Sequence, residues 1–241
     1  MSKRVAFLKE VTLFAGLSEA ELGTIVDNLH PREFKKDELV FRQGDHSREL
    51  YIVMRGKLRI FRISPSGAET TIAIYSTGSV VGEFAVVDSE PRSATAKAIE
   101  ATDLLVMSHD TFLQYMRQIP DLALGMTKLL ARRARWTAAY AETIAQYDAA
   151  GRLLHILLLY NDQFGEEQEA GKRYVLDLSL NQTDLASLVG ARREWVNRLL
   201  RDWQKRNIVA YEAGKIIILD LPRAKAERDS RIEANLSQTG W

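Results

Sequence analysis

Two short motifs ten residues apart, Gly82-Glu83 and Arg92-Ser93, carry the clearest chemical potential in the sequence. An arginine can form two parallel, charge-assisted hydrogen bonds to the free oxygens of a phosphodiester. The Ser93 hydroxyl and backbone N–H groups can satisfy the remaining phosphate oxygens, and the Glu83 carboxylate can accept a hydrogen bond from a ribose hydroxyl. Either motif alone is more often part of a surface ion pair on a turn. Together, inside a segment rich in predicted strands, they favour a site for a cyclic phosphodiester.

A second group of charged residues follows a glycine in the C-terminal part of the chain. Gly190 separates two predicted helices, Asp184–Leu188 and Arg193–Lys205. A helix that enters the major groove places its N-terminal residues against the bases, where arginine pairs with guanine and a carboxylate accepts from cytosine. On its own, a charged helix face of this kind is as often only solvated. The residues expected to contact DNA are Gln182, Thr183, Arg192, Arg193, Glu194, Asn197 and Arg198.

The composition is typical of a globular protein and narrows the function classes. Of 241 residues, 46% are hydrophobic and 27% are charged, and the formal net charge is +1, so a basic DNA-binding surface has to be local. The absence of cysteine excludes disulfides, zinc–thiolate sites and cysteine-ligated iron–sulfur clusters. The sequence predicts neither a signal peptide nor a membrane-spanning helix. We therefore expect a cytoplasmic protein that has no membrane partner.

Short strands are expected between residues 37 and 107. Glycines interrupt this segment at nearly regular intervals, which is typical of a sandwich, a jelly roll or a barrel. Within it, Leu50–Met54 and Leu58–Ile63 flank Arg55-Gly56, which predicts the turn of a β-hairpin.

Residues 121–147 are expected to form one long helix, because they contain no proline and carry a heptad pattern. At about 1.5 Å per residue this helix would be roughly 40 Å long. Such a helix can pack within its own chain or pair with its copy in a dimer, and its length favours the dimer. The heptad positions are Met126, Leu130, Arg133, Thr137, Tyr140, Ile144 and Tyr147.

Helix caps and turns predict the remaining elements. Ser18 and Glu21 have the spacing of a capping box, and Asp148 can cap a helix over Ala149–Tyr160. Gly165–Gly171 is expected to be a polar loop, and a strand over Lys215–Leu219 completes a winged helix-turn-helix pattern. The predicted class is α+β, with an N-terminal β jelly-roll barrel, a long dimerisation helix and a C-terminal winged helix-turn-helix. The predicted limits are 1–120, 121–147, 148–222 and, for a C-terminal tail, 223–241.

Over about residues 10–222 the chain resembles the CRP/FNR superfamily of bacterial regulators. The segment from Gly82 to Thr95 is similar to the phosphate-binding cassette of cyclic-nucleotide-binding domains. The resemblance implies that Arg92 binds the cyclic phosphate and that Glu83 binds the ribose hydroxyl. Ala131–Arg133 and Asp148–Arg152 resemble the dimer helix and the start of the DNA-binding domain. The nucleotide-binding residues that the resemblance implies are Gly82, Glu83, Phe84, Arg92, Ser93, Thr137 and Ala138.

Within that superfamily the chain is most similar to the cyclic-AMP receptor branch. Arg193-Glu194 and Arg198 carry the pattern that reads a TGTGA-like half-site there, but Trp195 stands where threonine is usual. Thr137 aligns with a threonine that contacts adenine, whereas Ala138 replaces a serine that the partner subunit donates. The resemblance implies a homodimer that binds palindromic double-stranded DNA and RNA polymerase. It favours cyclic AMP as effector over cyclic GMP, with no prosthetic cofactor.

Other function classes remain as alternatives. The same architecture could respond to another effector or act without one. A metal-dependent jelly-roll enzyme is disfavoured because the sequence shows no His-x-His motif, no Ser-His-Asp grouping and no P-loop, so we expect neither catalytic residues nor a metal site. A module that regulates a partner protein instead of DNA is opposed by the predicted helix-turn-helix.

Overall fold

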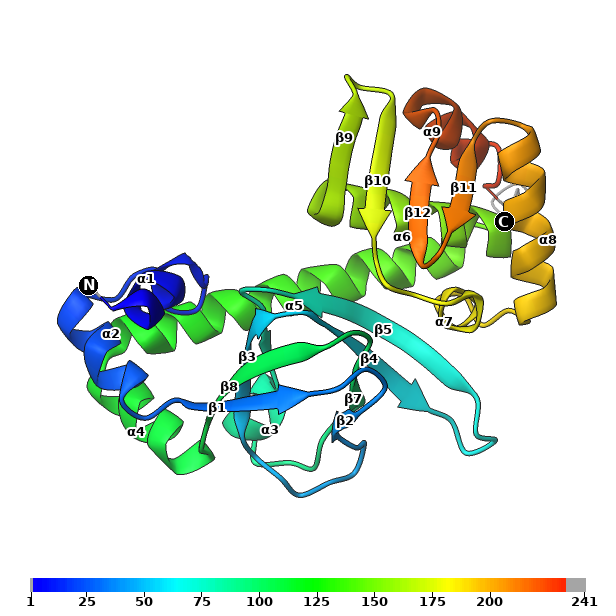
Figure 1. Cartoon of the computed structure of the whole chain (residues 1–241). Coiled ribbons are helices and arrows are strands. Elements are labelled where there is room, and N and C mark those ends of the chain that lie inside the picture. Colours follow the sequence, from blue (N-terminus) through cyan, green and yellow to red (C-terminus); the bar gives the residue numbers. More distant parts are fainter. Residues whose placement is uncertain (1, 233–241) are drawn as a thin grey trace, which may run out of the picture. The chain divides into compact units, whose positions relative to one another are not determined.

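In the computed structural model, which describes residues 2–232, the glycine-punctuated segment forms two four-stranded antiparallel sheets (Figure 1). The strand order in the first is β1 (His30–Phe34), β8 (Thr102–Met107), β3 (Leu50–Arg55) and β6 (Val80–Val81). In the second it is β2 (Leu39–Phe41), β7 (Thr95–Ala98), β4 (Lys57–Ile63) and β5 (Glu69–Ser76). This is the predicted jelly roll.

Alternation along the strands gives the first sheet two buried faces. Tyr51 and Val53 of β3 lie in a core shared with the second sheet. Leu50 and Ile52, which point to the opposite face because side chains alternate along a strand, lie in a core shared with helices. Those helices are α1 (Lys3–Glu10), α2 (Glu19–Val26), α3 (Glu83–Val87), α4 (His109–Gln118) and the first part of α5 (Pro120–Gln146).

The predicted hairpin at Arg55-Gly56 is wrong. β3 pairs with β8 and β6, whereas β4 pairs with β5 and β7, so the chain crosses from one sheet to the other at Gly56. Gly56 has a φ of +88°, and a Cβ there would lie 2.5 Å from the Ala101 carbonyl oxygen. Glycine is therefore required by both the backbone angle and the close approach of another segment.

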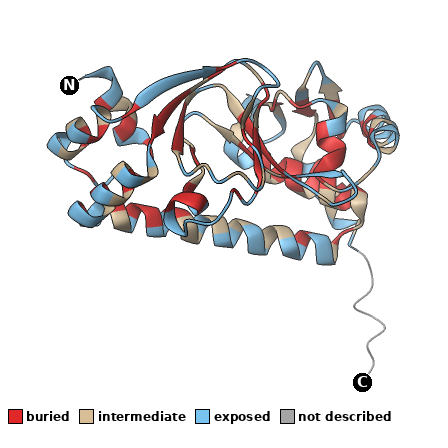
Figure 2. Cartoon of the chain, turned by 90° about the horizontal axis from the view of Figure 1, so that it is seen from below, coloured by how far each residue is buried: buried red, intermediate tan, exposed pale blue. Residues whose placement is uncertain are grey.

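Helix α5 is as long as predicted, but its heptad positions do not form an exposed seam. Met126 is buried in the helix-covered core, and Tyr147 is also buried. The Tyr140 hydroxyl donates to the Leu188 carbonyl at 2.8 Å, whereas Thr137 and Ile144 are exposed. Exposed residues recur on another face of this long helix (Figure 2).

The chain divides into two compact units, Met1–Trp136 and Thr137–Trp241. The second unit contains a four-stranded antiparallel sheet in the order β11-β12-β10-β9. Its strands are β9 (Gly165–Glu169), β10 (Arg173–Asp177), β11 (Val209–Glu212) and β12 (Lys215–Ile218), and its helices after α5 are α6 (Ala149–Phe164), α7 (Gln182–Ser187), α8 (Arg193–Lys205) and α9 (Leu221–Asp229).

Two segments of this unit differ from expectation. The predicted polar loop contains β9, an exposed strand whose polar residues pair with β10. The segment expected as a C-terminal tail, from residue 223, begins inside α9, whose Ala224 and Glu227 are buried. Residues 233–241 of that segment lie outside the described part of the chain. By contrast, the capping box at Ser18 and the N-cap at Asp148 are confirmed.

Candidate functional site

A pocket of about 510 Å³, part of it open to solvent, lies in the first unit beside α3 (Glu83–Val87). The predicted residues Gly82, Glu83, Phe84, Arg92 and Ser93 all line it. Its other lining residues are Phe41, Ile60, Ile72, Tyr75, Val81, Ala85 and Ala94.

Arg92 is almost fully buried, at 2% exposed, and its guanidinium donates three hydrogen bonds within the first unit. Its Nε donates to Ser47 Oγ at 3.1 Å, Nη1 to the Gly82 carbonyl at 3.1 Å and Nη2 to the Glu49 carbonyl at 2.8 Å. The guanidinium also lies 4.2 Å from the ring centroid of Phe41. Each Nη nitrogen keeps one further N–H, so the side chain retains the paired donors that suit two phosphate oxygens.

Burial lowers the pKa of the Arg92 guanidinium, but the group remains charged at neutral pH. Gly82, the N-cap of α3, has a φ of +89°. A Cβ there would lie 2.5 Å from Arg92 Nη1 and 2.9 Å from the Glu49 carbonyl oxygen. The glycine is therefore what allows the arginine to reach its backbone acceptors.

Glu83 has a partner that the sequence did not predict. The Glu83 side chain is 5% exposed and accepts from Arg133 Nε of α5 at 3.0 Å. Arg133 Nη2 also donates to the Val80 carbonyl at 2.8 Å, and its guanidinium lies 3.9 Å from the Tyr75 ring centroid. In the sequence, Arg133 stood out as the one charged residue among the heptad positions, which indicates that it has a partner. The heptad pattern does not identify Glu83 as that partner.

The other predicted pocket residues differ in exposure. Phe84 is 44% exposed and Ser93 is exposed, so both lie where a ligand can reach them. Thr137 and Ala138 are exposed positions of α5 and do not line this pocket. Their contact with a base stays a prediction.

In the second unit, α7 and α8 form the predicted helix-turn-helix. Asn181 caps α7 in a capping box with Asp184, and the turn contains Gly190 with a φ of +65°. Helix α8 runs from Arg193 to Lys205, as predicted. Leu185, Leu188, Val196 and Leu200 are buried against the rest of the unit.

The opposite face of α8 is polar and accessible. Arg193, Glu194 and Arg198 are exposed, and Asn197 between them is half-buried. None of these three charged side chains forms an ion pair with another described residue. Arg192 and Thr183 are exposed as well, whereas Gln182 and Trp195 are half-buried. The charged groups are thus available to a partner molecule.

Possible catalytic and metal-binding groups are sparse. Contrary to the sequence-based expectation, a hydrogen-bonded Ser-His-Asp series exists: Ser89 Oγ lies 3.4 Å from His109 Nε2, and His109 Nδ1 lies 2.9 Å from Asp110 Oδ1. The Asp110 side chain is 99% exposed, and a carboxylate so fully hydrated does little to orient or activate a histidine. Within residues 2–232, no cluster of three or more His, Cys, Asp or Glu side chains could hold a metal ion. The same residues contain no helix long and apolar enough to cross a bilayer.

Comparisons with known proteins match both halves of the chain. A model of the cyclic nucleotide-binding domain matches residues 31–119, and a model of the Crp-like helix-turn-helix domain matches residues 151–226. The CRP-like cAMP-activated global transcriptional regulator of Mycobacterium tuberculosis is 29% identical over 216 residues, which are 90% of this chain and 96% of that protein.

Two further proteins agree with this result. The cyclic AMP receptor protein of Thermus thermophilus is 30% identical over 209 residues, covering 87% of this chain and 93% of that protein. The c-di-GMP responsive global regulator CLP of Xanthomonas campestris has a similar structure, with a TM-score of 0.70 at 20% identity over 83% of this chain and 99% of that chain. At that identity the likeness concerns the fold alone.

Proposed function

Because the chain belongs to the CRP/FNR family of transcription regulators, we propose that it is a homodimer that binds cyclic AMP in its first unit and palindromic DNA through its second. The two family matches make it a cyclic-nucleotide-responsive regulator and not an enzyme. We assign residues 1–120 to nucleotide binding, 121–147 to dimerisation and 148–222 to DNA binding. We also propose RNA polymerase as a partner. We propose the cytoplasm as the location of the protein.

The observation that carries the effector proposal is the position of Arg92. It is buried in a pocket wall with two N–H groups still available, beside Glu83, Gly82 and Ser93. A cyclic phosphate carries one negative charge and two free oxygens, which match those donors in charge and number. The Glu83 carboxylate has a second oxygen that can accept from the ribose hydroxyl.

Two lines support cyclic AMP in particular. One relative is described as cAMP-activated and another as a cyclic AMP receptor protein, and Thr137 on α5 carries a hydroxyl that suits the adenine. Ala138, by contrast, offers no hydroxyl to the base. Cyclic GMP or another effector is therefore the alternative.

Exposed small residues along α5 support the dimer. They recur at spacings of three and four residues, so they share one face of the helix. Small side chains allow two helices to approach closely, and pairing of this face with its copy in a dimer would exclude water from it. The small residues are Thr127, Ala131, Ala134, Ala138, Ala141 and Ala145, of which only Ala131 is half-buried, and the larger, exposed Leu124 lies on the same face.

The exposed face of α8 supports the DNA proposal. Arg193, Glu194 and Arg198 lie near the start of the helix, where a recognition helix contacts base edges. In a symmetric dimer the two α8 helices would occupy major grooves about 34 Å apart, one turn of DNA. The operator would then be palindromic, with Arg193 and Arg198 directed at guanines.

Isothermal calorimetry with cyclic AMP and cyclic GMP tests the effector assignment. We expect the wild type to bind cyclic AMP more tightly, Arg92→Ala to lose binding, and Arg62→Ala, an exposed arginine of β4, to bind normally. Unchanged affinity in Arg92→Ala, with a normal melting temperature, would contradict the phosphate site. Tighter binding of cyclic GMP than of cyclic AMP would identify cyclic GMP as the effector. The assignment of the phosphate site would not change.

A further inference from the structure

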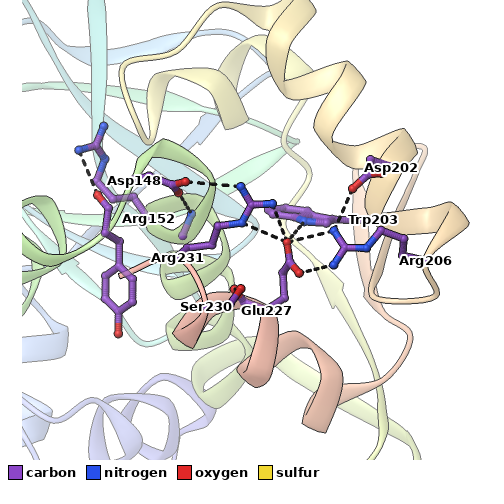
Figure 3. Close-up of polar contacts among 10 residues, drawn as sticks. Asp148, Arg152, Asp202, Trp203, Arg206, Glu227, Ser230 and Arg231 are labelled. Atoms are coloured by element: carbon purple, nitrogen blue, oxygen red, sulfur yellow. Dashed lines mark hydrogen bonds and ion pairs between the residues drawn. The ribbon is translucent and has the colours of Figure 1, made fainter. Parts of the chain in front are cut away.

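One buried carboxylate on α9 of the second unit binds side chains from the end of α8 and from the residues that follow α9 (Figure 3). Glu227 is 7% exposed. Its Oε1 accepts from Trp203 Nε1 at 3.4 Å, from Arg206 Nη1 at 3.1 Å and from Arg231 Nη2 at 2.8 Å, and Oε2 accepts from Arg206 Nη2. A carboxylate removed from water is stable only when it is paired in this way.

On one side the carboxylate fixes the end of α8. Arg206 is the C-cap residue of that helix, and Trp203, one turn earlier, is fully buried. Arg206 Nη1 also donates to Asp202 at 3.1 Å, and its backbone carbonyl accepts from Arg223 Nη1 of α9 at 3.3 Å. Side-chain and backbone contacts thus hold the C-terminal end of the proposed recognition helix against α9.

On the other side the same carboxylate is linked to the start of α6. Arg231 Nη1 donates to Asp148 Oδ2 at 3.4 Å, and the Arg231 carbonyl accepts from the Asp148 N–H at 3.1 Å. Asp148 is the N-cap of α6, where its Oδ1 accepts from the Gly151 N–H at 2.7 Å. A Cβ at Gly151 would lie 2.6 Å from Arg231 Cβ. The residues that follow α9 therefore lie directly on the junction at which α5 ends and α6 begins.

From these contacts we infer that α9 couples the α5–α6 junction to the recognition helix. A displacement of Asp148 moves Arg231, Arg231 shares Glu227 with Arg206, and Arg206 ends α8. Glu227 and Arg231 are positioning residues, because they contact neither nucleotide nor DNA in this scheme. The coupling rests on the proposed function, in which nucleotide binding changes the dimer helix α5 and thereby the junction.

A purely structural role for the cluster predicts a different result. If α9 only stabilised the unit, a variant would change DNA affinity equally with and without nucleotide. If α9 couples the α5–α6 junction to the recognition helix, a variant changes the ratio of the DNA affinity with nucleotide to the DNA affinity without it. That ratio is a readout that stability alone does not move.

The experiment uses the full-length protein and two variants that leave Glu227 paired. Asp148→Asn removes the charge that Arg231 contacts but keeps an equally good N-cap, and Arg231→Gln leaves Glu227 its contacts with Arg206 and Trp203. Lys225→Gln, at an exposed position of α9, is the matched control. The probe is the tightest duplex that the wild type selects from a random-sequence pool. Its affinity is measured by fluorescence anisotropy with and without saturating cyclic AMP.

We expect cyclic AMP to change the wild-type affinity about five-fold or more, and the Lys225→Gln affinity equally. In Asp148→Asn and Arg231→Gln the ratio should approach one, while calorimetry still detects nucleotide binding. A wild-type ratio in Asp148→Asn, which keeps its cap and fold, would overturn the coupling alone. A wild type that does not respond to nucleotide would overturn the proposed function, and the coupling with it.

Discussion

Arg133 of α5 and Glu83 of α3 form an ion pair at 3.0 Å beside the pocket, although fifty residues separate them in the chain. The contact joins the helix that we propose for dimerisation to the carboxylate that we propose for the ribose. It also neutralises a glutamate that is almost fully buried.

Removal of Arg133 should destabilise the first unit. Arg133→Ala leaves the Glu83 carboxylate buried without its cation, which costs about 3 kcal/mol or more. Addition of Glu83→Gln should recover a large part of this loss, because an amide needs no counter-charge. Urea unfolding measures both variants, with Arg132→Ala, an exposed neighbour on α5, as control. Equal losses in Arg132→Ala and Arg133→Ala would contradict a buried ion pair.

Gly82→Ala should impair the pocket through Arg92. The new methyl group would lie 2.5 Å from Arg92 Nη1, in a backbone conformation with a φ of +89°. Gly78→Ala is the matched control, because Gly78 has a φ of +82° and no heavy atom within 4 Å of the added Cβ. Both variants should lose about 1 kcal/mol of stability from the positive φ. Only Gly82→Ala should also weaken cyclic AMP binding, more than about ten-fold in calorimetry, and equal nucleotide affinities would show that the Arg92 geometry is not needed.

Arg193→Ala should relax base specificity at one position of each half-site. A bidentate arginine–guanine contact discriminates against other bases by about 1–3 kcal/mol, so the loss should be confined to operators that carry that guanine. Anisotropy titrations against a set of single-base operator variants measure it. Lys205→Ala, at the far end of α8, should lower the affinity for all operator variants by the same factor, or leave the affinity for all of them unchanged. A uniform loss in Arg193→Ala would mean that Arg193 contacts phosphate only.

Acid should weaken the second unit through Glu227. Hydrogen bonds from Arg206 hold the pKa of Glu227 at about 2 in the folded protein, below the ordinary value of 4.5. Because the folded pKa is the lower one, the stabilisation is present above pH 4.5 and is lost as the pH falls toward 2. Urea unfolding of the wild type and of Glu227→Gln at pH 7, 4 and 3 should show a difference that shrinks with acid. A difference that stays constant over this range would rule out the titration of Glu227.

Ala141→Glu should dissociate the proposed dimer. Ala141 is an exposed member of the small-residue face of α5, where a charged side chain would separate two closely packed helices. Analytical ultracentrifugation should detect a shift toward monomer at micromolar concentration. Ala20→Glu, at an exposed position of α2, should remain dimeric. If Ala141→Glu also remains dimeric, the dimer contact lies outside the small-residue face of α5.

Local patterns in the sequence were sufficient for many of these features. The limits of α8, the capping box at Ser18 and the pocket motifs around Glu83 and Arg92 depend on residues that are close in sequence. The heptad pattern predicted the length of α5 but not that Met126 and Tyr147 would be buried within their own chain, because an amphipathic helix has the same periodicity whichever body its apolar side contacts.

Features that depend on distant partners were missed. The Arg55-Gly56 turn has the local signature of a hairpin, and only the pairing of β3 and β4 with other strands shows that it joins two sheets. Arg133 cannot be assigned to Glu83 without the fold. Helix α9 was missed because its buried residues are Ala224 and Glu227, and the partners of Glu227, Arg206 and Arg231, can be assigned only from the fold.

The position of α9 has a consequence for how the protein is made. During synthesis the N-terminal domain of a chain generally folds first, and the first unit is complete once Trp136 has been added. The anchor of α8 is not available until Glu227 and Arg231 have left the ribosome, about ninety residues later. A growing chain therefore acquires the pocket for its effector well before it acquires a finished surface for DNA.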